Sequence, residues 1–443
     1  MSTSADIARI FALQQAHQWE AKASSAEQRK EKLRRLKAAV EAHADEIQAA
    51  VKKDTRKPDG EVKVTEVLGV LGNIQKNIDS LDEWMKPVDV VPSMNPNDKA
   101  RIVSEARGVC LILGPWNFPL GLTFGPLAAA IAAGNTCLVK LTDLCPATAA
   151  VAAKIVKQAF DEKEVALFEG GVDVATALLE LPVSHIFFTG STRVGKIVMA
   201  AAAKNLASVT LELGGKSPVI VDEGADVKKV AADLAAAKQF NGGQACISPD
   251  YVFVKEAQKG ALIAEFQARV RENLYRDDGS LKKESLAQIV NEQNFARIRK
   301  LFDEAVAKGA KVAVGGTLEP ADRTIHPTLL TDVTPDMSIL QEEIFAPIVP
   351  VVTYRTLDEV IGHIAGRAKP LALYIYSNDR ATIDRVLERT SSGGVTINGF
   401  FSHYLESRLP FGGVNQSGMG SYHGVFGFKA FSHERAIYVQ QGG

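Results

Sequence analysis

The sequence predicts an α/β protein with a doubly wound parallel sheet, a second α/β unit and a β arm. Short β-rich runs alternate with helical segments from Val109 to Phe188, which is typical of a parallel sheet covered by helices on both faces. The alternation restarts at Ser208 and continues to about Phe400. An extended stretch rich in proline and asparagine at residues 88–105 indicates a hairpin that leaves the main body. With 443 residues, 46% of them hydrophobic, the chain has room for two or three domains.

The N-terminal part, residues 25–84, is predicted to be helical. Apolar residues such as Leu33 and Leu36 recur there every three or four positions, and Pro87 ends the pattern. The basic residues between Arg29 and Arg35 alternate with acidic and apolar residues at helical spacing. We therefore interpret them as the solvated face of a helix rather than as a binding patch.

In the first alternating unit, three polar motifs lie at the ends of predicted strands. Asn117 follows the strand predicted at 109–113, Lys140 ends the one at 136–140, and Gly190 follows the one at 185–188. Ligands of open parallel sheets bind beyond the carboxyl ends of the strands, so we expect one crevice to gather all three. The unit is also expected to contain a strand at 165–168 and helices at 147–160 and 174–181.

The second unit is expected to begin with the strand at 208–213. The tail from Leu409 is rich in glycine and aromatic residues, and its β-prone end at 436–439 is expected to pair with the arm. Between these limits, the sequence predicts a helix at 228–240, a loop that carries Cys246, a strand at 251–254 and a long helix at 257–274.

Charge and cysteine content exclude several classes of function. A net charge of -1 argues against a nucleic-acid-binding surface, which normally carries a basic excess. The four cysteines are too few for a disulfide framework, and none is paired at metal-ligand spacing, so we expect a reducing compartment and no metal. The N-terminus lacks the charged and apolar regions of a signal peptide, and no apolar run is long enough to span a bilayer. These observations predict a cytoplasmic protein without membrane or nucleic-acid partners.

Three residues carry the functional groups needed for chemistry at a carbonyl carbon. Cys246 offers a thiol nucleophile, Glu212 a carboxylate that can activate water, and Asn117 an amide N–H that can hold an oxyanion. Cys246 is set among small and polar residues just past a helix end, whereas Cys110 and Cys137 lie in apolar strands and are expected to be inert. Taken alone, Cys246 is either such a nucleophile or an ordinary thiol.

The run from Phe187 to Lys196 is a strand, a glycine turn and an apolar helix. Such a turn lets a phosphate approach backbone N–H groups at a helix N-terminus, although the spacing is not G-x-G-x-x-G. The run is therefore either a dinucleotide site or an ordinary strand-to-helix turn. Three near matches are set aside: residues 418–424 as a loop, Gly215-Lys216-Ser217 as an incomplete P-loop, and Gln244-Ala245-Cys246 as an incomplete caspase signature.

Over nearly its whole length the chain resembles the aldehyde dehydrogenase superfamily. The tail at 415–424 and His403, five residues after Asn398, resemble the class 3 branch, which includes aromatic, medium-chain and fatty aldehyde dehydrogenases. Six motifs in the expected order carry the resemblance: Gly-Pro-Trp-Asn-Phe-Pro at 114–119, Phe-Thr-Gly-Ser-Thr at 188–192, Leu-Glu-Leu-Gly-Gly-Lys at 211–216, Gly-Gln-Ala-Cys at 243–246, Glu-Glu-Ile-Phe-Ala-Pro at 342–347 and Leu-Pro-Phe-Gly-Gly at 409–413.

The resemblance implies a catalytic role for each of the three residues. Cys246 would attack the aldehyde, and Asn117 with the Cys246 backbone N–H would hold the oxygen of the thiohemiacetal. Hydride would then pass to the nicotinamide, and Glu212 would activate the water that hydrolyses the thioester. The resemblance also implies a Rossmann-like NAD(P)-binding domain at 1–87 and 106–210, a catalytic domain at 211–400, and an oligomerisation arm and C-terminal tail at 88–105 and 401–443.

The implied cofactor is NAD or NADP. The family's usual Lys-Pro-Ser-Glu run stands here as Lys140-Leu141-Thr142-Asp143, so the carboxylate that would bind ribose hydroxyls is one methylene shorter. That change leaves both cofactors open. Ala346 replaces the glycine of the usual Glu-x-Phe-Gly-Pro run, which is expected to shift that loop slightly. The residues implied to bind the cofactor are Trp116, Lys140, Asp143, Gly190, Ser191, Gly195, Glu343 and Phe345.

Substrate and assembly are implied only in outline. Phe400, Phe401, His403 and Tyr404 lie where the class 3 branch closes its substrate funnel, so they either form a pocket for aromatic or medium-chain aldehydes or pack as core around a loop. A homodimer is expected from the branch. Two alternatives stay open: a CoA-acylating enzyme of the same fold, against which Glu212 argues, and a non-catalytic binding or structural protein.

Overall fold

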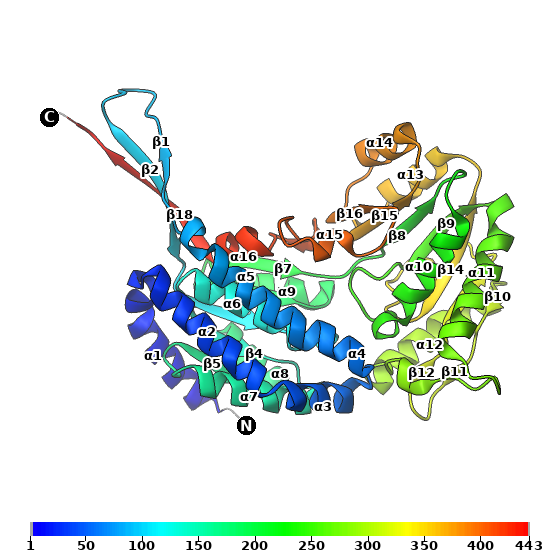
Figure 1. Cartoon of the computed structure of the whole chain (residues 1–443), viewed down its shortest axis with the longest axis horizontal. Coiled ribbons are helices and arrows are strands. Elements are labelled where there is room, and N and C mark those ends of the chain that lie inside the picture. Colours follow the sequence, from blue (N-terminus) through cyan, green and yellow to red (C-terminus); the bar gives the residue numbers. More distant parts are fainter. Residues whose placement is uncertain (1–2, 442–443) are drawn as a thin grey trace.

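The computed structural model describes residues 3–441 and shows two sheets with flanking helices and a projecting β arm (Figure 1). Thr3 and Ser25 cap the first two helices by accepting hydrogen bonds from backbone N–H groups, which fixes where these helices begin. A helix before residue 25, which the sequence analysis did not predict, precedes the expected block. The N-terminal helices are α1 (Ser4–Ala23), α2 (Ala26–Ala42), α3 (Ala44–Thr55), α4 (Asp59–Val62), the π-helix η1 (Lys63–Leu68) and α5 (Gly69–Trp84).

The first sheet has six strands in the order β17-β7-β6-β3-β4-β5. All neighbouring pairs are parallel except β17 with β7, and the chain runs outward from β3 in both directions, so this sheet is doubly wound as predicted. Its elements are β3 (Val109–Leu113), α6 (Gly121–Ala132), β4 (Thr136–Lys140), α7 (Pro146–Ala159), β5 (Val165–Phe168), α8 (Val172–Leu179), β6 (His185–Thr189), α9 (Thr192–Ala203), β7 (Ser208–Glu212) and β17 (Gly418–Met419).

Two expectations about this sheet are wrong. The strand at 208–212 does not open the second unit, because β7 pairs in parallel with β6 from Ser208 to Glu212 and so belongs to the first sheet. Residues 418–424 are not wholly a loop, because Gly418 and Met419 form the short strand β17 against Glu212 and Leu211. A run of β-rich residues predicts a strand but does not say which sheet it joins.

The second sheet has seven strands in the order β10-β13-β14-β9-β8-β15-β16, with only β10 antiparallel. It lies on the right of Figure 1. Its strands are β8 (Pro218–Val221), β9 (Tyr251–Lys255), β10 (Lys311–Val314), β13 (Thr328–Thr331), β14 (Ile348–Tyr354), β15 (Ala372–Tyr376) and β16 (Gly394–Ile397). The other elements of this unit are α10 (Val227–Gln239), η2 (Phe240–Gly243), α11 (Glu256–Leu274), η3 (Lys283–Ser285), α12 (Glu292–Ala307), β11 (Leu318–Glu319), β12 (Thr324–Ile325), η4 (Ser338–Leu340), α13 (Leu357–Ala365) and α14 (Arg380–Arg389).

The arm is a three-stranded antiparallel sheet of β1 (Val88–Val90), β2 (Lys99–Ala106) and β18 (Ser432–Val439). The predicted pairing of the tail with the arm is confirmed, since β18 pairs with β2 over its whole length, from Ser432 with Ala106 to Val439 with Lys99. The arm projects from the body at the upper left of Figure 1. Two short helices, α15 (Ser402–Leu405) and α16 (Gly424–Ala430), precede β18. No helix between residues 3 and 441 is both long enough and apolar enough to cross a bilayer.

Candidate active site

Four neighbouring strands of the first sheet end at one edge, and each is followed or ended by a predicted site residue. Asn117 follows β3, Lys140 ends β4, Gly190 follows β6 and Glu212 ends β7. The strands lie side by side in the order β4-β3-β6-β7 and are parallel, so their carboxyl ends meet. The four site residues therefore lie at one edge of the sheet, where ligands of open parallel sheets bind.

The Asn117 side chain joins this edge to the loop that carries Cys246. Asn117 is buried, and its Nδ2 donates to the carbonyl oxygen of Gln244 at 3.1 Å. The Asn241 side chain donates in turn to the Asn117 carbonyl oxygen at 3.0 Å. A carboxamide nitrogen carries two hydrogens, and one of those on Asn117 is taken by Gln244. The second hydrogen is left to hold a substrate oxygen.

The Cys246 loop begins with three consecutive left-handed residues, Asn241, Gly242 and Gly243, with φ of 48°, 58° and 72°. Gly243 is required on two grounds, because its φ favours glycine and a Cβ there would lie 2.4 Å from the Ala346 carbonyl oxygen. Cys246 itself is half-buried. Burial raises the pKa of its thiol to about 12, with further increase from the charges of Glu212 and Glu343.

Cys246 therefore differs from the other three cysteines, which are fully buried as free thiols. The predicted burial of Cys110 and Cys137 in strands is confirmed. Because a thiol with so high a pKa is protonated at neutral pH, an attack on a carbonyl requires a base nearby.

Glu212 is such a candidate base. Its side chain is buried, and neither carboxylate oxygen has a hydrogen-bond partner among residues 3–441. Burial raises its pKa well above the usual value. A buried carboxyl group without partners is costly unless it serves a ligand or water, and its charge is close enough to affect the pKa of Cys246.

The turn between β6 and α9 has the features of a phosphate site. Ser191 caps α9 by accepting from the Val194 N–H at 3.4 Å. Gly190 lies against the ring of Phe188, where a Cβ would be only 2.5 Å from the nearest ring carbon, so the close contact favours glycine. Gly195 is buried in the helix against Leu213, which follows β7, so its missing side chain allows α9 to pack closely there.

Lys140 and Asp143 lie on the other side of β3, at the end of β4. Lys140 is buried and its Nζ donates to the Leu141 carbonyl at 3.0 Å. Burial lowers the pKa of Lys140, while the charges of Asp143 and Asp173 oppose this shift. Asp143 is exposed. Lys140 is thus placed at the crevice with a carboxylate near it.

The loop with Glu343 and Phe345 reaches this edge from the second unit. The rings of Trp116 and Phe345 meet edge to face with centroids 5.4 Å apart. Phe345 has a left-handed φ of 56°. Glu343 lies so close to the chain at Gly214 that a Cβ there would lie 2.2 Å from its Oε2. Burial raises the pKa of Glu343 to about 8, aided by the charge of Asp250 and opposed by a hydrogen bond from the Gly215 N–H.

Three further residues, none of which was expected to belong to the site, hold this loop. Arg297 donates to the carbonyls of Glu343 and Ile344 at 2.9 and 2.8 Å. Lys216 donates to the Glu342 carbonyl at 3.0 Å and forms an ion pair with Asp250. Lys216 lies within the motif at 211–216, but no local pattern marks Arg297 or Asp250.

A series of aromatic rings connects the Asn117 loop with the segment around residue 401. Phe118 stacks on Phe240 with ring centroids 5.5 Å apart, and the centroids of Phe240 and Phe401 are 5.8 Å apart. Tyr404 is near enough to the site that the charges of Cys246 and Glu212 add to the effect of burial in raising its pKa.

The structure does not bring His403 to the surface of the site. Its ring is buried against Gly394, and its Nδ1 contacts the Thr396 hydroxyl at 2.7 Å. His403 therefore supports the loop. Phe400 packs against Tyr374 with centroids 4.7 Å apart, and both it and Phe401 are half-buried on the main core.

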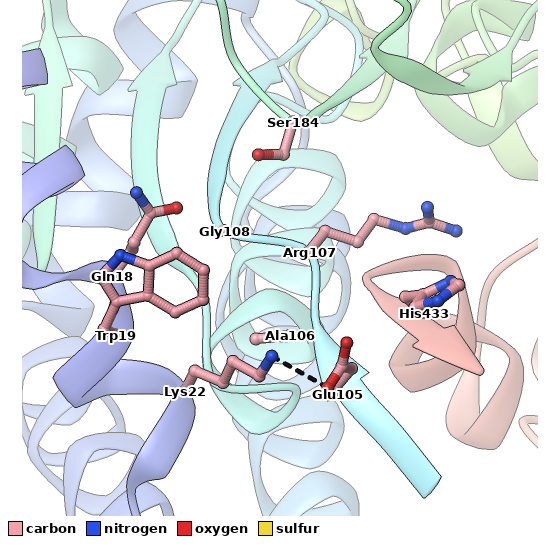
Figure 2. A pocket seen from close by; sticks show the side chains of 9 residues that line it. All are labelled: Gln18, Trp19, Lys22, Glu105, Ala106, Arg107, Gly108, Ser184 and His433. Atoms are coloured by element: carbon pink, nitrogen blue, oxygen red, sulfur yellow. Dashed lines mark ion pairs between the residues drawn. The ribbon is translucent and has the colours of Figure 1, made fainter. Parts of the chain in front are cut away.

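A cavity of about 260 Å³ lies elsewhere, at the base of the arm (Figure 2). It is lined by Trp19, Arg107, Ser184 and His433, among others, and by the ion pair of Lys22 with Glu105. Because Ser184 precedes β6, the cavity is at the amino end of the first sheet, opposite the crevice. Among the described residues, no group of three or more His, Cys, Asp or Glu side chains is arranged to hold a metal.

Comparison with known proteins agrees with this geometry. The chain matches the model of the aldehyde dehydrogenase family over residues 1–437. "Putative aldehyde dehydrogenase AldX" of Bacillus subtilis (strain 168) is 51% identical over 98% of each chain. "Probable coniferyl aldehyde dehydrogenase" of Caulobacter vibrioides is 41% identical over 94% of this chain and 87% of its own. "Aldehyde dehydrogenase family 3 member A2" of Pongo abelii is also 41% identical, over 93% of this chain and 84% of its own.

Among solved structures, the substrate-bound state of Staphylococcus aureus AldH has a TM-score of 0.94 with 38% identity, covering 98% of this chain and 94% of that one. The predicted resemblance to the superfamily and to its class 3 branch is therefore confirmed. The chain belongs to the aldehyde dehydrogenase family and is an enzyme that oxidises aldehydes with NAD or NADP as its cofactor.

Proposed function

We propose that this enzyme oxidises aromatic or medium-chain aldehydes to carboxylic acids through a thioester on Cys246. The observation that carries the proposal is Glu212, a buried carboxyl group without a hydrogen-bond partner among the described residues, close enough to Cys246 to affect its pKa. A hydrolytic reaction needs such a base, whereas transfer of the acyl group to CoA does not.

In the first step, the Cys246 sulfur bonds to the aldehyde carbon. The thiol proton passes to ionised Glu212, directly or through water. The aldehyde oxygen becomes an oxyanion held by the free N–H of the Asn117 amide and by the Cys246 backbone N–H. Asn117 is suited to this role because its other N–H is already fixed by Gln244, which orients the carboxamide.

NAD(P), when bound, supplies the acceptor of the hydride that leaves the former aldehyde carbon, which converts the thiohemiacetal to a thioester. The chain offers a fitting site for the pyrophosphate, with the capped N-terminus of α9 and the turn at Gly190 that precedes it. We assign Lys140 and Asp143 to the adenosine ribose, and Glu343 with Phe345 and Trp116 to the nicotinamide side.

Hydrolysis completes the reaction. Glu212, having released its first proton, takes a proton from water as the oxygen bonds to the thioester carbon. The carbon–sulfur bond then breaks, the leaving sulfur takes the proton back from Glu212, and the carboxylic acid leaves with the thiol and the ionised carboxylate restored. Asn117 holds the oxyanion of this second tetrahedral species as well.

Aromatic lining supports the choice of substrate. Phe118, Phe240 and Phe401 form a continuous series of ring contacts beside the Asn117 loop, and all three are only partly buried. Such a surface favours apolar and aromatic substituents on the aldehyde. A relative with 41% identity is named as a probable coniferyl aldehyde dehydrogenase, and coniferyl aldehyde is an aromatic aldehyde.

A panel of aromatic and aliphatic aldehydes, assayed with NAD and with NADP at 340 nm, tests the proposal. We expect higher kcat/KM for benzaldehyde-like and medium-chain substrates than for acetaldehyde, and the free acid as product with or without CoA. Formation of acyl-CoA would overturn the hydrolytic assignment. A Cys246→Ala variant with undiminished oxidation would overturn the thioester mechanism.

We assign a separate role to each of three regions of the chain. We propose that residues 1–87 and 106–210 form the NAD(P)-binding domain, that 211–400 form the catalytic domain, and that 88–105 with 401–443 form the oligomerisation arm and tail. The strand β7 shows that the first sheet extends to residue 212. We also propose a cytoplasmic location, which the four free cysteines support.

We further propose a homodimer formed through the arm. Val91 and Met94 at the hairpin are 85% and 90% exposed, which is unusual for large apolar residues unless another surface covers them. Light scattering after size exclusion tests this. The double variant Val91→Asp, Met94→Asp should be monomeric, while Val172→Asp, at a residue 79% exposed on α8, should leave the dimer intact.

A further inference from the structure

Three acidic and basic side chains from one N-terminal segment, residues 57–66, reach into the site from outside. Lys57 precedes α4, Glu61 lies on α4 and Glu66 on the π-helix η1. None is part of the proposed reaction, yet each contacts a loop that carries a reacting group. π-helical turns inside helices often occur at functional sites.

Lys57 holds the Asn117 backbone. Its side chain is fully buried, and its Nζ donates to the Asn117 carbonyl oxygen at 2.9 Å and to Glu66 Oε1 at 2.9 Å. The ammonium group also lies 4.1 Å from the centre of the Phe118 ring, at cation–π distance. One buried cation thus contacts both Asn117 and the residue after it.

Glu66 holds the other end of the same loop. Its Oε2 accepts from the N–H groups of Leu120 and Gly121 at 3.0 and 2.8 Å, where α6 begins. This negative charge at a helix N-terminus satisfies two N–H groups that have no partner within the helix. The two segments of the backbone approach closely here, since a Cβ at Gly121 would lie 2.9 Å from the Thr65 carbonyl oxygen.

Glu61 holds the loop that leads to Cys246. Its Oε2 accepts from the Asn241 N–H at 2.8 Å. Asn241 is the first of the three left-handed residues, and its side chain donates to the carbonyls of Asn117 and Gln244, both at 3.0 Å. The segment therefore binds the Asn117 loop directly and the Cys246 loop through Asn241.

Stability alone is a weak reason for such an arrangement. A buried ion pair costs desolvation energy that its attraction often does not exceed, and apolar replacement is frequently neutral or stabilising. Both members of the Lys57–Glu66 pair are fully buried, and the other hydrogen bonds of their side chains are all made to the Asn117 loop. Their contacts fix geometry at Asn117.

We propose that Lys57, Glu61 and Glu66 are positioning residues that keep the oxyanion-binding amide of Asn117 in register with the sulfur of Cys246. The proposal rests on the roles of Asn117 and Cys246 proposed above. A displacement of about 1 Å at a reacting centre can reduce the rate by about 10²-fold, so loss of these contacts should lower kcat without removing any reacting group.

The double variant Lys57→Met, Glu66→Gln tests the proposal, because it removes both buried charges and keeps the volume similar. We expect kcat to fall by about 10- to 100-fold, in keeping with a misplaced oxyanion donor. Alkylation of Cys246 by iodoacetamide, which needs no oxyanion donor, and the Kd for NAD(P) should stay within about 3-fold. Parallel losses in all three measurements would indicate a merely structural role and overturn the proposal.

Arg29→Met is the matched control. Arg29 is a buried cation at the opposite end of α6, where it donates to the Ala132 carbonyl at 3.1 Å and to the Lys22 carbonyl at 2.9 Å. Its loss should lower Tm while kcat, measured well below Tm, stays unchanged. A fall in kcat equal to that of the double variant would contradict positioning.

Repeating the substitutions in Asn117→Ala separates this proposal from the proposed function. If the segment acts through Asn117, Lys57→Met, Glu66→Gln should cause no further loss of kcat in that background. The same loss in both backgrounds would overturn the positioning role. Undiminished activity of Asn117→Ala alone would instead overturn the assigned role of Asn117.

Glu61 provides a second test should the double variant fail to fold. Glu61 is only partly buried, so its removal is compatible with the fold. Glu61→Ala should lower kcat by about 10-fold, whereas Glu61→Gln should restore most of the rate because an amide oxygen still accepts from the Asn241 N–H. Wild-type kcat in Glu61→Ala, or no recovery in Glu61→Gln, would contradict the proposal.

Discussion

The two halves of the crevice are positioned by different means. On the cofactor side, Lys140 ends a strand and Ser191 caps a helix, so regular elements place them. On the catalytic side, Asn117 and Cys246 lie in irregular loops that are held by side chains from residues 57–66, and the Cys246 loop begins with left-handed residues. A sheet edge places the groups that bind and the base Glu212, whereas buried polar contacts from elsewhere place the nucleophile and the oxyanion donor.

This contrast has a kinetic consequence. Substitutions on the catalytic side should lower kcat, since the contacts they remove are made in the transition state. Substitutions on the cofactor side should raise the KM for NAD(P) and leave kcat nearly unchanged. A residue on one side whose substitution changed both kcat and the KM for NAD(P) strongly would contradict this division.

Glu212→Gln should have the largest effect. The amide keeps the shape of the carboxyl group but cannot accept a proton, so kcat should fall by about 10²- to 10⁴-fold, the usual contribution of a general base. Because Glu212 also takes the thiol proton in the first step, the pre-steady-state burst of reduced cofactor should slow together with kcat. A variant with normal kcat and a normal burst would contradict the base role.

Asn117→Ala should lower kcat by about 10²- to 10³-fold through loss of one oxyanion donor. Asn135→Ala is its matched control, because Asn135 is a buried amide that donates to the Ala130 and Phe431 carbonyls far from the crevice. The control should lose thermal stability and keep its kcat. Equal rate losses in both variants would point to general destabilisation.

The sheet edge was predictable from sequence because its signals are local. Strand runs that end at Lys140 and before Gly190 each show in a few neighbouring residues, and parallel alternation brings those ends together. The contacts of Lys57 with Asn117 and of Glu61 with Asn241 span 60 and 180 positions. No local pattern reports them. For the same reason, the sequence predicted a strand at 208–213 but assigned it to the wrong sheet.

His403 illustrates another limit. Its position suggested the substrate pocket, yet a histidine between aromatic residues has the same local sequence whether its ring faces a pocket or the core. The structure resolves this through Gly394, whose missing side chain leaves the space that the His403 ring fills. The neighbouring Phe401 contacts Phe240, and Tyr404 is close enough to Cys246 for the thiol's charge to affect its pKa.

The pH dependence of kcat should follow Glu212. Because burial raises the pKa of this carboxyl group, it is neutral at a pH where an exposed glutamate is ionised. A base must be ionised, so kcat should rise with pH through the raised pKa and level off above it. Glu212→Gln should lack this limb. An unchanged limb in that variant would assign it to another group, such as Glu343.

Gly190→Ala should act on the cofactor side. The added methyl group would lie 2.5 Å from the Phe188 ring, so the turn must move and the phosphate site with it. We expect the KM for NAD(P) to rise by about tenfold, equivalent to ~1.4 kcal/mol of lost binding. The kcat at saturating cofactor should stay within about 2-fold, because a residue that only binds the cofactor should change the activation free energy little. A 2-fold change corresponds to about 0.4 kcal/mol, at ~1.4 kcal/mol per tenfold. A large fall in kcat would show that this turn also places the reacting groups.

Asp143→Ala should have the smallest effect, a change in the preference between NAD and NADP. Asp143 is an exposed carboxylate whose charge reaches Lys140, so it should repel a 2′-phosphate bound beside that lysine. At about 4 Å in water the repulsion is about 1 kcal/mol, so the ratio of kcat/KM for NADP to that for NAD should rise about 5-fold. Asp277→Ala, another exposed aspartate in the second unit, should leave the ratio unchanged. High salt should reduce the shift, because exposed charges are screened. A shift that persists at 1 M salt would mean that Asp143 discriminates by hydrogen bonds to the ribose hydroxyls rather than by charge.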